Sequence, residues 1–268
     1  MKKIFGQLQR IGKSLMLPIA VLPAAALLQR FGAEDLLNIP FINAAGAAIF
    51  DNLALLFAIG VAVGISDDGS GAAGLSGLVG YFVITEGAKT INSDINMGVL
   101  AGIIAGLLAG SLYNRYHEIR LPDFLGFFGG KRFVPIITGT FGILLAALFG
   151  YIWPPIQGVI HNFGEWLTTS GPLGVGLYGM FNQLLIPLGL HHVLNSLVWF
   201  VFGEFTTSAG EVVTGDLSRF FAGDPSAGTF MAGFYPIFMF GMPAAALAMY
   251  HTAAKNQKKV VGGLLFSV

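Results

Sequence analysis

The chain has no cysteine among its 268 residues. That absence excludes disulfide bonds, thiolate metal sites and a cysteine nucleophile within the chain. Charge is also scarce, because Asp, Glu, Lys and Arg together make up 10% of the chain, against about a quarter in soluble domains. The 14 basic and 14 acidic residues cancel, so the net charge gives no indication of a nucleic-acid partner.

Apolar residues and glycine take the place of the missing charge. The chain is 54% hydrophobic with 38 glycines, and its mean hydropathy is +0.74. This composition predicts an all-α, polytopic membrane protein whose helices cross the lipid bilayer. Apolar runs lie at 14–32, 48–65, 71–87, 94–112, 134–153 and 172–202, and a broken run lies at 226–250. We therefore expect about six to seven spans.

Basic residues predict which side of the membrane each loop faces. Residues 1–13 place apolar side chains at helical spacing among basic and amide ones, which indicates an amphipathic helix at the cytoplasmic surface. A second basic cluster follows the fourth run, and it comprises Arg115, Arg120, Lys131 and Arg132. The loop 154–171 has no Lys or Arg. The positive-inside rule places both basic clusters in the cytoplasm and 154–171 outside.

The topology of the C-terminal part depends on 226–250. If 203–225 is cytoplasmic, Lys258 and Lys259 return to the cytoplasm only when 226–250 re-enters the membrane without crossing it. The segment is interrupted by Gly228, Gly233, Pro236, Gly241 and Pro243. Such breaks are tolerated at membrane depth where protein or water satisfies the freed backbone groups. We expect a broken or re-entrant helical hairpin, with an ordinary kinked span as the alternative.

The strongest candidate for a binding site is the sequence Gly-Leu-His-His-Val-Leu-Asn-Ser at 189–196. Polar side chains in so apolar a run usually face a cavity and bind something. His191 and Asn195 are four residues apart and share a helix face, whereas His192 points about 100° away from His191. Diverging histidines without a nearby carboxylate make a poor metal site, so we predict none.

Histidine and amide side chains suit hydrogen bonding to sugar hydroxyls, or proton transfer from one. We take His191 and His192 as candidate catalytic and binding residues. The amides that we expect to bind substrate are Asn182, Gln183 and Asn195. The alternative for either histidine is a structural role, with its ring bonded to a backbone carbonyl.

Two other polar clusters have simpler interpretations. Residues 67–71, Asp-Asp-Gly-Ser-Gly, lack the alternating ligands of a calcium loop and the lysine of a phosphate loop. They predict a tight solvated turn. Residues 121–133 are too apolar for a plain loop and too basic for a span, so we expect them along the cytoplasmic interface, in contact with lipid or a docking partner.

The longer motifs resemble a known family. The first is Leu-Pro-Asp at 121–123 with Phe-Phe-Gly-Gly-Lys-Arg-Phe-Val-Pro at 127–135, and the second is the histidine motif. The third runs from Phe-Ala-Gly-Asp-Pro-Ser-Ala-Gly at 221–228 through Gly-Met-Pro-Ala-Ala at 241–245. These three motifs resemble the membrane-embedded IIC domain of the bacterial sugar phosphotransferase system, glucose superfamily. The Leu-His-His-Val-Leu-Asn form is most similar to the N-acetylglucosamine branch. Glucose is the closest rival substrate.

The resemblance implies a function. Such proteins are inner-membrane homodimers that bind a sugar from outside and expose it inward. There a phosphocysteine on a IIB domain phosphorylates the 6-hydroxyl of the sugar, and the IIB domain receives its phosphoryl group from IIA. No further cofactor is implied. The matching motif puts His191, His192 and Asn195 at the sugar site. By the same resemblance, 14–171 is the dimer-forming bundle, 172–268 is an incomplete sugar-transport region, and the N-terminus is cytoplasmic.

One family feature is missing from the chain. The family carries a Gly-Ile-Thr-Glu-Pro motif, whose glutamate contacts the sugar, beyond the position of Val268. Residues 260–268 look like the start of another span, but as a helix they cover only about 14 Å of the ~30 Å hydrocarbon core. We therefore expect a truncated form that is inactive alone, with a purely structural role as an alternative. A secondary transporter is disfavoured, because Asp51 and Glu86 lie near the ends of the runs rather than in mid-span.

Overall fold

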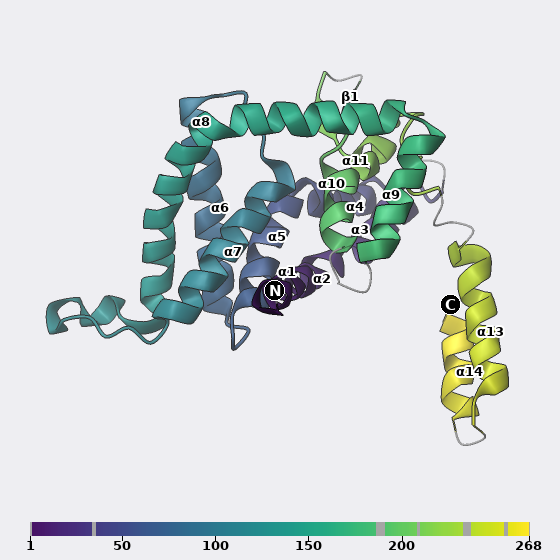
Figure 1. Ribbon diagram of the computed structural model, residues 1–268, viewed down its shortest axis with the longest axis horizontal. Coiled ribbons are helices and arrows are strands. Elements are labelled where there is room, and N and C mark those ends of the chain that lie inside the picture. The colour runs from purple at the N-terminus through teal and green to yellow at the C-terminus, as the bar shows by residue number, and fades with distance from the viewer. Residues whose placement is uncertain are drawn as a thin grey trace.

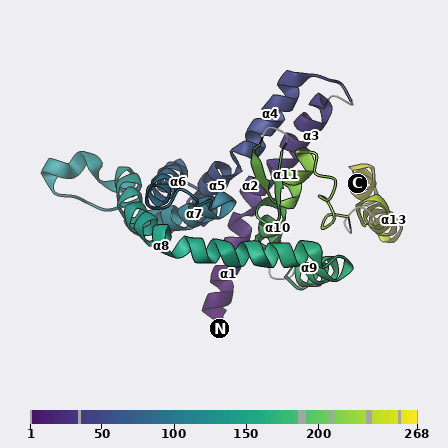
Figure 2. The ribbon, with the colours of Figure 1, turned by 90° about the horizontal axis from the view of Figure 1, so that it is seen from above.

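The computed structural model describes residues 2–33, 36–185, 191–207, 210–232, 237–254 and 257–267. These ranges are mostly helical, with one two-stranded sheet among them. Figures 1 and 2 show a central bundle of helices, a long bent helix that follows two of its sides, and a C-terminal helical pair beyond the bundle. The prediction of a mainly helical chain is therefore confirmed, and the two-stranded sheet is an addition that the sequence did not predict.

The N-terminal helices form a nearly continuous rod and a bent pair. They are α1 (Lys2–Ser14), α2 (Met16–Ile19), α3 (Leu22–Gly32), α4 (Pro40–Asp51) and α5 (Leu53–Ile65). The predicted helix over 1–13 is present, and only Leu15 separates it from α2. The helices α4 and α5 are bent by 57° at Asn52, so the run predicted at 48–65 begins inside one helix and ends in another.

The core of the bundle is built by α5, α6 (Gly71–Ile91) and α7 (Gly98–Tyr116). Gly102, Gly106 and Gly110 recur every four residues and form a stripe along α7. A Cβ atom at Gly106 would lie 2.7 Å from the Cβ of Val61 on α5, which is too close for two carbon atoms. The small residues therefore allow the two backbones to approach closely, as in many membrane helix pairs.

The long helix α8 (Phe133–Thr169) is bent where two prolines interrupt it. Pro154 and Pro155 have no N–H group for the helix ladder, and their rings clash with the carbonyls of Gly150 and Tyr151. The first part of α8 stands beside α6, and the second part crosses one end of the bundle toward α9 (Figure 1). The segment before it forms two short 3-10 helices, η1 (Asp123–Phe128) and η2 (Gly130–Arg132).

Ion pairs gather the basic residues at one end of the bundle, which we call the basic end. Arg10 donates to Asp67 at 2.5 Å, and Lys131 donates to Asp68 at 2.9 Å. The turn at 67–71 therefore joins α1 to η2, immediately before α8. Its interpretation as a tight turn is confirmed, because Gly69 has a φ of +63° and Ser70 caps α6. The arm at 121–133 projects from this end with Phe124 84% exposed, and its contact with lipid remains a prediction.

The run at 172–202 is not one helix, contrary to the expectation of a single apolar span. It forms α9 (Pro172–Leu185) and α10 (His191–Phe200). The hydroxyl of Tyr178 on α9 donates a 2.9 Å hydrogen bond to Asn195 Oδ1 on α10, although the residues are 17 positions apart. One continuous helix would separate them by about 25 Å, so the chain folds back. A proline at 187 favours a helix end near Leu185.

The chain then passes through β1 (Glu204–Thr206), β2 (Val212–Thr214) and α11 (Asp216–Phe221). The two strands pair antiparallel, with Phe205 opposite Val213. Glu204 and Thr214 line the same hollow as Trp153 and Gln157 of α8, so the sheet lies at the end opposite the basic end. This position differs from the premise that 203–225 shares the side of the basic residues, and which side of the membrane it faces remains a prediction.

The C-terminal part is interrupted, as the glycines and prolines of 226–250 predict. Turns cover residues 225–232. They are followed by a short π-helix at Ile237–Gly241, α13 (Met242–Thr252) and α14 (Lys258–Ser267). The helices α13 and α14 lie side by side. With 203–225 at the opposite end, a crossing between α11 and α14 would return Lys258 to the basic side, so a re-entrant 226–250 is no longer required.

Length and apolarity identify fewer spans than the sequence predicts. In the described part of the chain, three helical stretches suffice to cross a bilayer, and the bent α4–α5 pair would make a fourth. The three are Gln9–Gly32, Gly98–Tyr116 and Gly130–Ile160. The expected six to seven spans therefore remain a prediction.

Candidate functional site

The hairpin of α9 and α10 brings most of the predicted polar residues to one face. The Tyr178–Asn195 hydrogen bond fixes which residues stand opposite each other. Asn182 follows Tyr178 by one helical turn on α9, and His191 precedes Asn195 by one turn on α10. Because the two helices run in opposite directions, this spacing places Asn182 opposite His191. The two amides and the histidine thus belong to a single cluster with Tyr178, which we call the hairpin cluster.

The hairpin cluster is largely removed from solvent. Asn182 is 3% exposed and Asn195 is 6% exposed, and His191 is half-buried. The side-chain oxygen of Asn182 is buried and has no hydrogen-bond partner among the described residues. A buried polar atom without a partner costs about 1–3 kcal/mol, so Asn182 has an unused acceptor that a ligand can satisfy.

The other two predicted residues are placed differently. Gln183 is exposed and lies about 100° around α9 from Asn182, so the structure does not bring it to the hairpin cluster. The backbone of His192 belongs to α10, but its side chain lies outside the described residues. The structure therefore supports His191, Asn182 and Asn195 as neighbours and leaves His192 as a prediction.

Apolar residues shield the hairpin cluster on the side of the C-terminal turns. The ring of Phe230 meets that of Tyr178 edge-on, with centroids 5.6 Å apart. Val198 and Phe202 complete this packing and are almost fully buried. A low-dielectric surrounding strengthens each hydrogen bond that the cluster makes.

A buried ion network supports the turn that carries Phe230. Arg219 Nε donates to Asp224 Oδ2 at 2.7 Å, and its Nη2 donates to the hydroxyl of Ser226 at 2.7 Å. The amide of Gly228 donates to Asp216 Oδ1 at 2.9 Å. These contacts fix the chain between α11 and Phe230, so the network positions one wall of the hairpin cluster.

The two carboxylates of this network have different electrostatic surroundings. Burial raises the pKa of Asp216, although the amide of Gly228 and the charge of Arg219 oppose the shift. Burial acts in the same direction on Asp224, but the hydrogen bonds from Ser226 and Arg219 outweigh it and hold the pKa of Asp224 below its ordinary value. Asp224 is therefore the ionised partner of Arg219.

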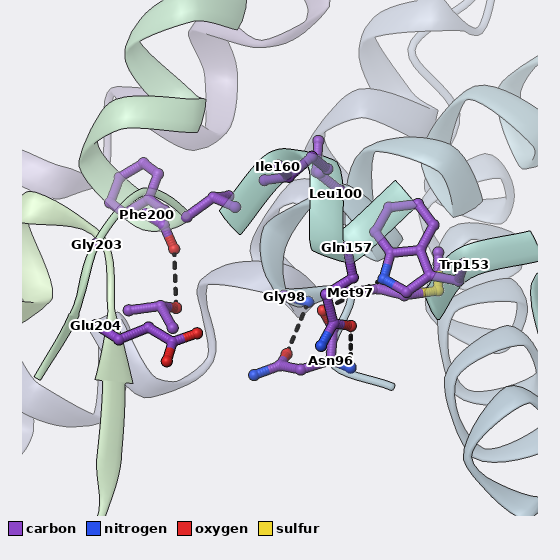
Figure 3. A pocket seen from close by; sticks show the side chains of 12 residues that line it. Asn96, Met97, Gly98, Leu100, Trp153, Gln157, Ile160, Phe200, Gly203 and Glu204 are labelled. Atoms are coloured by element: carbon purple, nitrogen blue, oxygen red, sulfur yellow. Dashed lines mark hydrogen bonds between the residues drawn. The ribbon is translucent and has the colours of Figure 1, made fainter. Parts of the chain in front are cut away.

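An open hollow lies at the end opposite the basic end. Figure 3 shows Trp153 and Gln157 of α8 on one side and Phe200, Gly203 and Glu204 on the other. Gln157 Oε1 accepts a 3.0 Å hydrogen bond from the amide of Asn96, so the second part of α8 fixes the loop before α7. None of the predicted site residues in the described ranges lines this hollow.

Sequence reasoning missed Tyr178 and the network around Arg219. Tyr178 lies four residues before Asn182 and therefore on the same helix face, which was a usable signal. The pairing of Arg219 with Asp224 was not readable, because residues five apart face each other only once the helix has ended. Among the residues that the structure describes, no three His, Asp or Glu side chains gather as a metal site would require.

Comparison with known proteins decides the family. Residues 12–268 match the family model described as phosphotransferase system, EIIC. The chain belongs to the EIIC family. This agrees with the resemblance that the histidine motif and the two flanking motifs indicate, and it identifies the chain as an EIIC component of a phosphotransferase system.

Curated relatives cover nearly the whole EIIC chain. The N-acetylglucosamine-specific EIICBA component of Klebsiella pneumoniae is 63% identical over 265 residues, which are 99% of this chain and 41% of the relative. The N-acetylglucosamine-specific EIICB component of Bacillus subtilis (strain 168) is 56% identical over 96% of this chain and 56% of its own length. A glucose-specific EIICBA component of Staphylococcus carnosus (strain TM300) is 44% identical over 99% of this chain and 46% of the relative. The chain thus spans about two fifths to a little over half of these relatives.

Proposed function

We propose that this EIIC chain carries N-acetylglucosamine across the bacterial inner membrane while the sugar is phosphorylated. The observation that carries the proposal is the hairpin cluster, in which Tyr178, Asn182 and Asn195 are buried and His191 is half-buried, within an apolar protein of this family. Hydrogen-bonding groups held in a water-poor site are what binding of a polyhydroxylated ligand requires. The higher identity to relatives named for N-acetylglucosamine supports that sugar over glucose.

The chemistry divides between this chain and its partners. The phosphoryl group comes from a phosphocysteine on a IIB domain that IIA recharges, and the chain itself has no cysteine. When the phosphorus–sulfur bond breaks, the phosphoryl group passes to the oxygen of the sugar 6-hydroxyl, whose proton must leave. Asn182 and Asn195 bind and orient the sugar, and His191 or His192 is the proton acceptor that this chain offers.

The orientation follows from the basic end. With Arg10, Arg115, Lys131 and Arg132 on the cytoplasmic side, the N-terminus is cytoplasmic and the hollow of Figure 3 opens outward. Sugar then enters from the side of the hollow and leaves toward the side where a IIB domain docks. We also propose a homodimer, as the family resemblance implies, with 14–171 forming the contact.

The test is uptake in a bacterial strain that lacks its own N-acetylglucosamine and glucose transport but supplies the phosphocarrier proteins. The full-length protein that contains this chain should convert labelled N-acetylglucosamine to its 6-phosphate inside the cell. Replacement His191→Ala should abolish uptake with unchanged membrane insertion, whereas His251→Ala, an exposed histidine of α13, should leave uptake intact.

Two results would contradict this function. Accumulation of glucose 6-phosphate without any product from N-acetylglucosamine would favour the glucose-specific alternative. Loss of folded protein in the His191 variant, with normal uptake by whatever protein remains, would assign His191 a structural role.

A further inference from the structure

We infer that the hairpin cluster recognises the acetamido group of its sugar through one hydrogen-bond donor, the side-chain nitrogen of Asn195, and one acceptor, the side-chain oxygen of Asn182. Tyr178 is the positioning residue that orients the amide of Asn195. The inference rests on the proposed function and identifies the part of the ligand that the cluster selects. It concerns a carboxamide on the sugar ring, as distinct from the hydroxyl that glucose carries at the same carbon.

The donor is the side-chain amide nitrogen of Asn195. An asparagine side chain offers one acceptor oxygen and two N–H donors. The hydroxyl of Tyr178 donates to the oxygen of Asn195 at 2.9 Å, in a buried contact. This hydrogen bond fixes which way the amide faces. The nitrogen of Asn195 makes no hydrogen bond to another described residue, so its N–H groups remain for a ligand oxygen.

The acceptor is the side-chain oxygen of Asn182. It is buried and has no partner among the described residues, and the residue is 3% exposed. Asn182 lies on the same face of α9 as Tyr178, one helical turn away. The donor on α10 and the acceptor on α9 are therefore offset along the hairpin by about one turn, which is roughly 5 Å.

A secondary amide complements this pair, and a hydroxyl does not. An acetamido group presents a carbonyl oxygen, which accepts, and an N–H group, which donates, and the two point in opposite directions within one rigid plane. A hydroxyl donates and accepts at a single oxygen, so it cannot reach two protein groups offset by a turn. Glucose would leave at least one buried amide group unsatisfied, which is how polar sites reject an analogue.

The cluster also has the packing that such recognition needs. Phe230 lies edge-on against the Tyr178 ring, and the network of Arg219 and Asp224 holds the turn that leads to Phe230. Tyr178 is thus restrained both at its ring and at its hydroxyl. A donor that is already oriented loses little freedom when the ligand binds.

The experiment compares the binding of three sugars by the full-length protein in lipid nanodiscs. Labelled sugar is displaced by N-acetylglucosamine, glucosamine and glucose, and the ratios of the dissociation constants are measured. Replacement Tyr178→Phe keeps the ring and removes the hydroxyl. We expect it to lower the preference for N-acetylglucosamine over glucose about tenfold, as the loss of one oriented hydrogen bond would. The matched control is Tyr151→Phe, because Tyr151 is 75% exposed on α8.

A second variant keeps the inference falsifiable if Tyr178→Phe does not fold. Replacement Asn182→Leu removes the acceptor and keeps the branched shape of the side chain, and it should weaken N-acetylglucosamine about tenfold while leaving glucose unchanged or tighter. Equal weakening of all three sugars, or an unchanged ratio in folded variants, would overturn the inference but not the proposed function. Binding of glucose without binding of N-acetylglucosamine by the wild-type protein would overturn both.

Discussion

Replacement Gly106→Ala should separate α5 from α7 and destabilise the bundle. A Cβ atom at position 106 would lie 2.7 Å from Val61 Cβ and 2.9 Å from the carbonyl oxygen of Ala58. Carbon atoms prefer about 3.5–4.0 Å, so the helices would have to move apart by roughly 1 Å. The neighbouring glycines 102 and 110 share this contact, and the whole stripe would loosen with it.

Two opposing effects set the change in the free energy of unfolding that Gly106→Ala should cause. Alanine is the better helix former and stabilises a helix by up to about 1 kcal/mol relative to glycine. Overpacking typically costs about 1–3 kcal/mol, and the upper part of that range applies here because one of the two contacts is backbone, which has no rotamer to relieve it. We therefore expect a net loss of about 1–2 kcal/mol.

Thermal unfolding in lipid nanodiscs measures the effect, with Gly158→Ala as the matched control. A Cβ at Gly158, on the exposed part of α8, would meet nothing within 4 Å, so this variant keeps only the gain in helix propensity. The apparent melting temperature should fall for Gly106→Ala and stay equal or rise for Gly158→Ala. Equal or higher stability of Gly106→Ala would refute the close packing of α5 on α7.

Three further predictions concern charge and topology. The hydrogen bonds from Lys131 and Tyr113 hold the pKa of Asp68 below its ordinary value of 3.8. The stability advantage of wild type over Asp68→Asn should therefore be complete above pH 3.8 and disappear as the pH falls through the lower pKa of the folded state. Melting curves at pH 7 and pH 3 check this, and an equal difference at both pH values would contradict it. Arg219→Met should leave Asp224, whose side chain is 6% exposed, as a buried charge without its partner. This should lower the free energy of unfolding by about 3–5 kcal/mol and reduce the yield of monodisperse protein. A normal yield would show that the network is dispensable. Because the chain has no native cysteine, Val212→Cys should react with an impermeant thiol reagent on intact cells and Phe124→Cys only after permeabilisation; the reverse pattern would invert the topology.

The sequence alone determined the class of the protein and the kind of its site. The scarcity of charge and the apolar runs require helices in a bilayer, because only internally hydrogen-bonded backbones are stable there. The positive-inside rule placed residues 1–13 and the cluster of Arg115, Arg120, Lys131 and Arg132 on one side. The ion pairs of Arg10 and Lys131 bring a member of each group to one end of the bundle, and its cytoplasmic orientation stays a prediction. The motif around His191 marked the polar segment, since its side chains have no partners in hydrocarbon.

Only the tertiary structure decided which polar residues meet. Helical periodicity relates His191 to Asn195 within one helix, but it cannot show that the chain turns back and sets Tyr178 against Asn195. The fold also sets Glu204 and Thr214 at the end opposite the basic residues, a position that charge counting does not predict. Such contacts depend on how two helices pack in space, and local propensity does not encode that arrangement. Periodicity identifies the face of each helix, and packing determines what that face meets.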